Sequence, residues 1–163
     1  MDSLFVKTLL DVLHVIATVI WIGGMMINYM VIRPVAVKKL EPSSFASFNT
    51  AMMKRFRILV YISIVILGVT GIPMKIVSEH YAGIISFEHA WGTASFIKHL
   101  LYGLLVVLAV FNFEIATPAL SKAAIMGNQI RIGRWKKRMA ISGALAMLAA
   151  IGTLVLSSLM RYL

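Results

Sequence analysis

Cysteine is absent from this 163-residue sequence, and acidic residues are scarce, since six Asp and Glu stand against sixteen Lys and Arg. Without cysteine the chain forms no disulfide bond, no thiolate metal site and no cysteine nucleophile. Charged residues of both signs make up only 13% of the chain, whereas hydrophobic residues make up 60%. A soluble domain usually has about 25% charged residues. The composition therefore excludes a soluble domain and predicts a protein embedded in a lipid bilayer.

Four long apolar stretches divide the chain, at about 4–32, 58–78, 95–118 and 139–160. Each is long enough for the roughly 20 residues that a spanning helix needs. The first is too long for a cleavable signal peptide, no A-x-A site follows it, and it ends in basic residues. No Gly/Ser linker, repeat or low-complexity tract separates the stretches. We therefore expect an all-α integral membrane four-helix bundle that forms a single domain over 1–163.

Twelve of the sixteen basic residues lie in two connections between these stretches. They are Arg33, Lys38, Lys39, Lys54, Arg55 and Arg57 in one, and Lys122, Arg131, Arg134, Lys136, Lys137 and Arg138 in the other. The remaining connection, about 79–94, carries Glu79 and Glu88 and no Lys or Arg. The positive-inside rule predicts that both basic loops are cytoplasmic, with both termini on the outer side of the plasma (inner) membrane. This distribution explains the positive charge without a nucleic-acid partner. No segment outside the predicted helices could form a folded element that recognises the bases of DNA or RNA.

The first basic connection is long for a helix hairpin, and it has a pattern of its own. Pro42-Ser43-Ser44 resembles a helix N-terminus, and four apolar residues after it are spaced for one face: Phe45, Phe48, Met52 and Met53. This pattern predicts a short amphipathic helix on the inner membrane surface.

Polar and small residues recur on one face of the predicted spans. In the first span they are Lys7, Asp11, His14, Thr18, Trp21, Met25 and Asn28, and in the third Lys98, Tyr102, Leu105, Ala109 and Asn112. Steps of three and four keep each set on one stripe. Such stripes are either packing seams or the lining of a bundle interior. For the first span we favour the lining, because intramembrane His, Asp and Lys are costly and usually functional.

Two histidines lie at matching depths in the predicted bundle. His14 is 19 residues from Arg33, and His99 is 19 residues from Pro118. At about 1.5 Å per residue, both are expected near the outer edge of the hydrocarbon, where they would face each other. Imidazole is a good ligand for iron, copper and zinc, so this pair is the strongest candidate metal site. The alternative is that both histidines only form hydrogen bonds with neighbours.

A haem b between these two histidines is the leading interpretation of the pair. Other residues would then contact the cofactor: Lys75 and Lys98 near the propionates, Trp21 and Tyr102 beside the ring, and Gly103 leaving room for it. His80 and His89, in the outer loop, are weaker metal-ligand candidates. Met25, Met26 and Met30 either hold Cu(I) or fill the core. Glu114 either pairs with Arg33 or Arg57 or relays protons.

The run from His14 through Trp21 to Gly23-Gly24, followed by Arg33-Pro34, resembles a family signature. It is similar to the first helix of the CopD-type copper-resistance membrane proteins and of the HemJ-type protoporphyrinogen oxidases. The stretch from Trp91 to Asn112 resembles a later helix of these proteins, with a Lys near its start. In the oxidases the first-helix His and this Lys are implicated in haem binding and activity. The resemblance implies those roles for His14 and Lys98.

The sequence thus predicts a haem b-binding membrane protein that acts in electron transfer, with His14 and His99 as axial ligands. Two alternatives stay open: a CopD-like protein that handles copper, and a HemJ-like oxidase of protoporphyrinogen. The expected partners are the bilayer and either other membrane or redox subunits or a second copy of the chain. The sequence identifies no catalytic residue and leaves open whether the protein is an enzyme.

Overall fold

The computed structural model describes residues 4–81, 83 and 85–163. The chain forms α-helices with three inserted π-helical segments, η1 to η3. In chain order they are α1 (Leu4–Thr18), η1 (Val19–Gly23), α2 (Gly24–Ile27), η2 (Asn28–Ile32), α3 (Arg33–Lys39), α4 (Pro42–Ile76), α5 (Ala90–Val110), η3 (Phe111–Ala116), α6 (Thr117–Ile125) and α7 (Gln129–Leu159).

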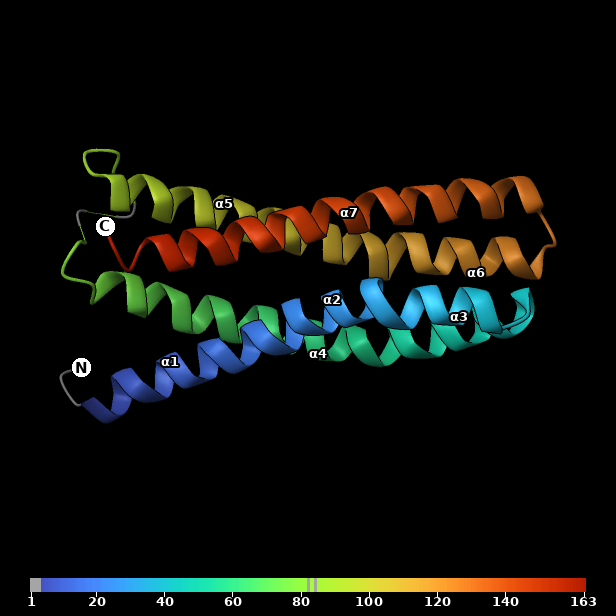
Figure 1. The fold of residues 1–163 in the computed structure, drawn as a ribbon, viewed down its shortest axis with the longest axis horizontal. Coiled ribbons are helices and arrows are strands. Elements are labelled where there is room, and N and C mark those ends of the chain that lie inside the picture. The colour runs from blue at the N-terminus through green and yellow to red at the C-terminus, as the bar shows by residue number, and fades with distance from the viewer. Residues whose placement is uncertain (1–3, 82, 84) are drawn as a thin grey trace.

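Within the described residues, four helices are long and apolar enough to cross a membrane, and they lie side by side as a bundle (Figure 1). They are Leu4–Lys39, Ser47–Ile76, Ala90–Ile125 and Gln129–Leu159. Large apolar side chains such as Val65, Val107 and Leu148 are exposed on the outside of the bundle. This surface suits contact with lipid chains and would be costly in water. The expected all-helical fold with four long apolar helices is confirmed.

Local sequence explains where α4 and α7 begin and where α6 ends. Leu40 has extended backbone geometry, and Pro42 follows in the first turn of α4, where its missing N–H costs nothing. Gly127 ends α6 with φ of +64°, a left-handed conformation that glycine adopts without strain. Asn128 then caps α7, because its side chain accepts a hydrogen bond from the Arg131 backbone N–H at 2.9 Å.

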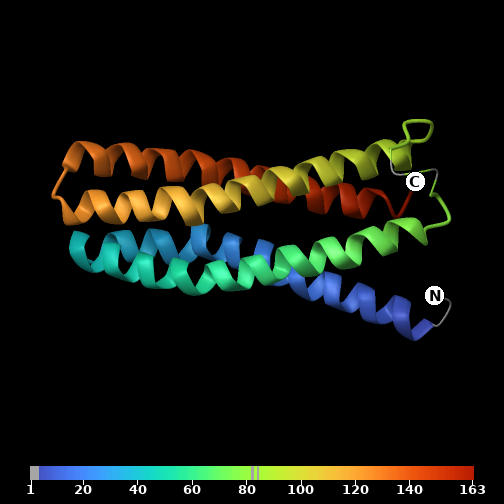
Figure 2. The same cartoon turned by 180° about the vertical axis from the view of Figure 1, so that it is seen from behind.

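The bundle has two chemically different ends. The start of α1, the end of α7 and the connection between α4 and α5 lie together at one end, here called the terminal end (Figure 1). The turns at 40–41 and 126–128 lie at the other end, here called the basic end, as the view from behind also shows (Figure 2). The predicted basic loops therefore share one end of the molecule, and the start of α1 and the end of α7 share the other.

The short surface helix expected in the first basic connection is not a separate element. Residues 42–57 are the first turns of α4, a helix of 35 residues that continues to Ile76. The physical reason is that the sequence from Ser43 to Leu67 contains neither Gly nor Pro. Because extending a helix is easier than starting one, the helical turns continue into the second span.

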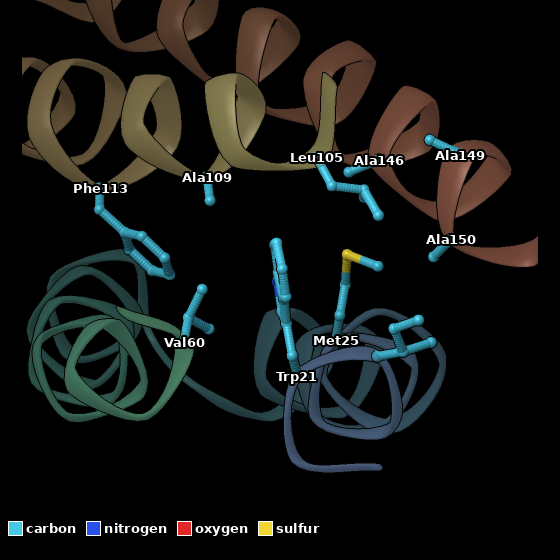
Figure 3. Close-up of a cluster of buried hydrophobic side chains, with 10 residues drawn as sticks. Trp21, Met25, Val60, Leu105, Ala109, Phe113, Ala146, Ala149 and Ala150 are labelled. Carbon is cyan, nitrogen blue, oxygen red and sulfur yellow. The ribbon is translucent and has the colours of Figure 1, made fainter. Parts of the chain in front are cut away.

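The core lies where the four spans come closest. α1 packs on α4 and α5 packs on α7. Between these two pairs, Trp21 and Met25 point from the first span toward Leu105 and the small residues Ala146 and Ala149 (Figure 3). Alanines on α7 let the helices approach closely, which is how helices pack in lipid. Beyond this core, α1 diverges from the other helices toward the terminal end (Figures 1 and 2).

Candidate functional site

His14 is held between α1 and α4 by a hydrogen bond to a buried threonine. Its Nδ1 lies 2.8 Å from Thr70 Oγ1, and Thr70 Oγ1 donates to the Ile66 carbonyl at 2.7 Å. A hydroxyl has one proton, so Thr70 accepts from His14 Nδ1–H. The proton on Nδ1 leaves Nε2 of the neutral ring with its lone pair free. His14 therefore presents the nitrogen that a metal ion needs.

A glycine of α4 lies beside this imidazole. A Cβ added at Gly71 would lie 3.4 Å from His14 Cε1, which is ordinary van der Waals contact. Gly71 lies one residue after Thr70, so the hydrogen bond to His14 and this close contact come from the same turn of α4. The position of His14 is therefore built into the packing of α1 on α4.

His99 presents its ring in the same tautomer, on the other side of the bundle. Its Nδ1 lies 2.6 Å from the Ser95 carbonyl oxygen, one turn back on α5. A carbonyl only accepts, so Nδ1 carries the proton and Nε2 is free. His99 lies within electrostatic range of His14. The ring itself is exposed, whereas the neighbouring Lys98 is half-buried.

The face of α5 explains this difference. Consecutive helical residues point about 100° apart. The inward stripe predicted from the sequence begins at Lys98 and continues through Tyr102 to the buried Leu105 and Ala109. His99 is one position off this stripe. The depth of His99 in the membrane could be counted from the sequence, but that count did not show that His99 lies beside the stripe. Lys98 is the α5 side chain that the helix turns toward His14.

Charged groups gather around the two histidines at the terminal end. Lys98 interacts electrostatically with Lys75 of α4, and both lysines interact with His99. Asp11, one turn before His14, contributes a negative charge beside that ring. The lysines expected beside haem propionates thus do lie near the histidines, on α4 and α5.

The remaining residues expected beside a cofactor have different surroundings. Trp21 is buried and meets Tyr102 edge to face, with ring centroids 6.1 Å apart. The Tyr102 hydroxyl donates to the Ile64 carbonyl at 2.8 Å, so both rings are fixed in the core. Gly103 is exposed, on the same side of α5 as His99, and no atom lies within 4 Å of a Cβ built there. The room that Gly103 leaves is therefore at the surface.

The two loop histidines lie outside this arrangement. His80 stacks on Trp91, with centroids 5.9 Å apart and planes 27° apart, and His89 directly precedes α5. Among the residues that the structure describes, no group of three or more His, Asp or Glu side chains is close enough to hold a metal ion. A site of three nitrogen or oxygen ligands, the kind that harder divalent ions prefer, is not formed there.

Three methionines from different spans line one small cavity in the core. Met25 of α2, Met53 of α4 and Met139 of α7 border a cavity of about 70 Å³. Met30, which the sequence grouped with Met25, is 69% exposed on the outside of the bundle. Spacing along one helix identified Met25. It did not identify Met53 and Met139 as its partners, because their contact with this cavity depends on how separate spans pack.

A larger cavity of about 420 Å³ lies toward the basic end. It is bordered by Arg33, Lys136 and nine other residues, and it shares four of them with the smaller cavity: Asn28, Tyr29, Met53 and Met139. Asn28 is buried, and its Oδ1 has no hydrogen-bond partner. The two cavities together reach from the central core toward the basic end.

Glu114 pairs with one of the two arginines expected for it. Arg57 Nη1 lies 3.3 Å from Glu114 Oε2, and the Tyr61 hydroxyl donates to Oε1 at 2.7 Å. Arg33 instead lies over the Tyr29 ring, 5.6 Å from its centroid. The ion-pair interpretation of Glu114 is therefore the one that the geometry favours.

Comparison with known proteins finds a similarity to one curated protein. The chain is 27% identical over 150 residues to Copper resistance protein D of Pseudomonas syringae pv. tomato, covering 88% of this chain and 47% of that protein. The chain thus spans about half the length of this relative. No solved structure matches the chain. The resemblance to HemJ-type oxidases has no support in these comparisons and stays a prediction.

The family match covers most of the bundle, from the first span to the turn before α7. The four apolar helices and the similarity to Copper resistance protein D support a multi-pass membrane protein. Residues 16–129 match the family described as "Domain of unknown function (DUF4149)", and the chain belongs to this family.

Proposed function

We propose that this protein binds Cu(I) inside the membrane and takes part in handling copper. The proposal draws on the similarity to Copper resistance protein D and on the ligands that the bundle offers. We also propose that the protein lies in the plasma membrane with the basic end toward the cytoplasm and both termini outside, following the positive-inside rule. Its partners would be other membrane subunits or a second copy of the chain.

The observation that carries the proposal is the state of the two intramembrane histidines. Hydrogen bonds at Nδ1 fix both rings so that Nε2 of His14 and Nε2 of His99 keep their lone pairs. A hydrogen-bond partner at the other ring nitrogen is typical of metal-binding histidines. Imidazole suits copper, and Cu(I) accepts low coordination numbers, so it does not need the three-carboxylate or three-histidine group that the described residues lack.

The direct test is Cu(I) binding by the purified chain, measured by competition with a chromophoric chelator under reducing conditions. We expect His14→Ala and His99→Ala each to weaken the Cu(I) affinity at the terminal end at least tenfold, about 1.4 kcal/mol. His89→Ala is the matched control, because His89 lies outside the bundle and should not change this affinity. If the double variant of His14 and His99 binds Cu(I) as the unchanged protein does, the proposed site is wrong.

Haem b remains a second candidate for the same two nitrogens. The observation that favours it is the pair of lysines, Lys75 and Lys98, which suit propionate carboxylates. Protein purified after expression with ample haem would then show a Soret band and a sharp reduced α band, consistent with electron transfer. A colourless protein that binds Cu(I) would decide for copper. Restored growth of a strain that lacks protoporphyrinogen oxidation would support the enzyme interpretation.

A further inference from the structure

We propose that Met25, Met53 and Met139 form a second Cu(I) site, built from sulfur and separate from the histidines. This inference rests on the proposed copper function and deepens it. The histidines offer nitrogen ligands toward the terminal end, whereas the methionines border the cavity in the middle of the bundle. The protein would then hold Cu(I) at two successive positions along the bundle axis.

The cavity has the size and surroundings of an ion site. At about 70 Å³ it exceeds the roughly 10–15 Å³ that one water molecule needs. Its other walls include the large apolar side chains of Trp21, Phe56 and Leu105, so the surroundings of the methionines are mainly apolar. In Figure 3 the Met25 side chain points away from its own helix, toward α5 and α7. The sulfur therefore lies inside the bundle and does not face the lipid.

The chemistry of this donor set selects a soft, singly charged ion. Thioether sulfur is a soft ligand that binds Cu(I) in preference to hard divalent cations. Methionines carry no charge, so they do not neutralise the ion they bind. Burying a divalent cation among neutral ligands would cost far more than burying a monovalent one.

An unpartnered buried oxygen provides an independent indication of a ligand. Asn28 is 93% buried and borders the same cavity, and its Oδ1 has no hydrogen-bond partner. A buried polar atom without a partner is unusual, because it costs free energy. The amide oxygen is the negative end of a dipole, and a cation held by the nearby sulfurs would compensate for the missing hydrogen bond.

The charges at the basic end determine the side from which a free ion arrives. Arg33 and Lys136 border the larger cavity that continues from the methionines, and Lys136 is exposed. Their positive charge opposes direct access of Cu(I) from the basic end. A free ion would therefore arrive from the side of His14, past Trp21, and an anionic copper complex would be favoured at the basic end.

Methionine also fills cores without any metal, and this alternative defines the test. Leucine conserves the volume of methionine and removes only the sulfur, so Met25→Leu/Met53→Leu/Met139→Leu should keep the fold. The control is Met30→Leu/Met126→Leu, because both residues are exposed. Circular dichroism verifies the helix content of every variant, and each single variant is measured in case the triple variant unfolds.

The readouts are Cu(I) stoichiometry and X-ray absorption at the copper edge, using purified full-length protein loaded with Cu(I) alone. We expect two Cu(I) per chain and a copper–sulfur signal in the unchanged protein and in the control variant. The triple leucine variant should lose one Cu(I) and the sulfur signal, and each single variant should weaken the sulfur site at least tenfold. The His14→Ala/His99→Ala variant should lose the other ion and keep the sulfur signal.

Three results would overturn the inference, and they are distinguishable. If the unchanged protein binds Cu(I) only through nitrogen, or if the leucine variants keep the sulfur signal, the methionine site is wrong while the histidine site stands. If the unchanged protein binds no Cu(I), both the inference and the proposed function fail.

Discussion

His14 Nδ1 and Thr70 Oγ1 lie 2.8 Å apart and join the first span to the second. Because Thr70 Oγ1 is already a donor to Ile66, this contact determines which nitrogen of His14 is free. The contact joins α1 to α4, and Figure 1 shows α1 diverging from the other helices toward the terminal end.

Thr70→Val should therefore weaken copper binding without removing any ligand. Valine has the shape of threonine but cannot accept the His14 proton, so the ring loses its fixed tautomer. Loss of a hydrogen-bond partner that orients a ligating histidine typically costs about 10–100-fold in metal affinity. The measurement is Cu(I) competition, with Thr153→Val as control, because Thr153 Oγ1 only donates to Ala149 of its own helix. Equal effects of the two changes would show that Thr70 does not act through His14.

The amino-acid sequence predicted the bundle well because the relevant signal is local. Each span is an apolar run of sufficient length, and each inward stripe follows helical spacing within one segment. The stripe of the first span shows how far this works: Trp21, Met25 and Asn28 are buried as predicted. Lys7 and Asp11, nearer the start of α1, are exposed, and α1 diverges from the other helices toward that end (Figure 1).

The site was less predictable because it depends on contacts between spans. Depth placed His14 and His99 at the same end, but depth does not specify the face, and His99 lies beside the inward stripe. The partner of His14 is Thr70, 56 residues away in the sequence. The sulfur-lined cavity joins Met25 to Met53 and Met139 across three spans, and no spacing within one helix encodes that.

Gly143→Ala should destabilise the bundle more than any other glycine change in α7. A Cβ at Gly143 would overlap the Tyr29 phenol, whose hydroxyl donates to the Met139 carbonyl at 3.2 Å. Moving this ring would break the hydrogen bond, and overpacking typically costs about 1–3 kcal/mol. Thermal unfolding in detergent measures the effect.

Gly133→Ala is the matched control for this change, because no atom lies within 4 Å of a Cβ built there. It should be neutral or stabilising by about 0.5–1 kcal/mol, since alanine favours a helix more than glycine does. Adding Tyr29→Leu to Gly143→Ala should recover part of the lost stability. A Gly143→Ala protein as stable as the Gly133→Ala protein would contradict the close packing of α7 on the first span.

The Arg57–Glu114 pair should contribute little to stability. The nitrogen and oxygen are 3.3 Å apart, but the side chains are 40% and 44% exposed. Exposed pairs are typically worth about 0.2–1 kcal/mol and weaken with salt. A double-mutant cycle of Arg57→Gln and Glu114→Gln should give a coupling in this range, with Lys54→Gln as control. A coupling free energy above about 2 kcal/mol that does not change with salt concentration would place the pair in the hydrocarbon region and not among the lipid headgroups.

The absence of cysteine makes the proposed orientation directly measurable. Single cysteines introduced into the natural sequence are the only thiols, so a membrane-impermeant maleimide reports the side on which each one lies. Ser78→Cys and Arg161→Cys lie toward the terminal end, and Lys39→Cys and Asn128→Cys lie at the basic end. Because basic loops are retained in the cytoplasm, the first two should react in intact cells and the last two only after permeabilisation. The reverse pattern would place the histidines in the cytoplasmic half of the membrane, and Cu(I) would then have to reach His14 from inside the cell.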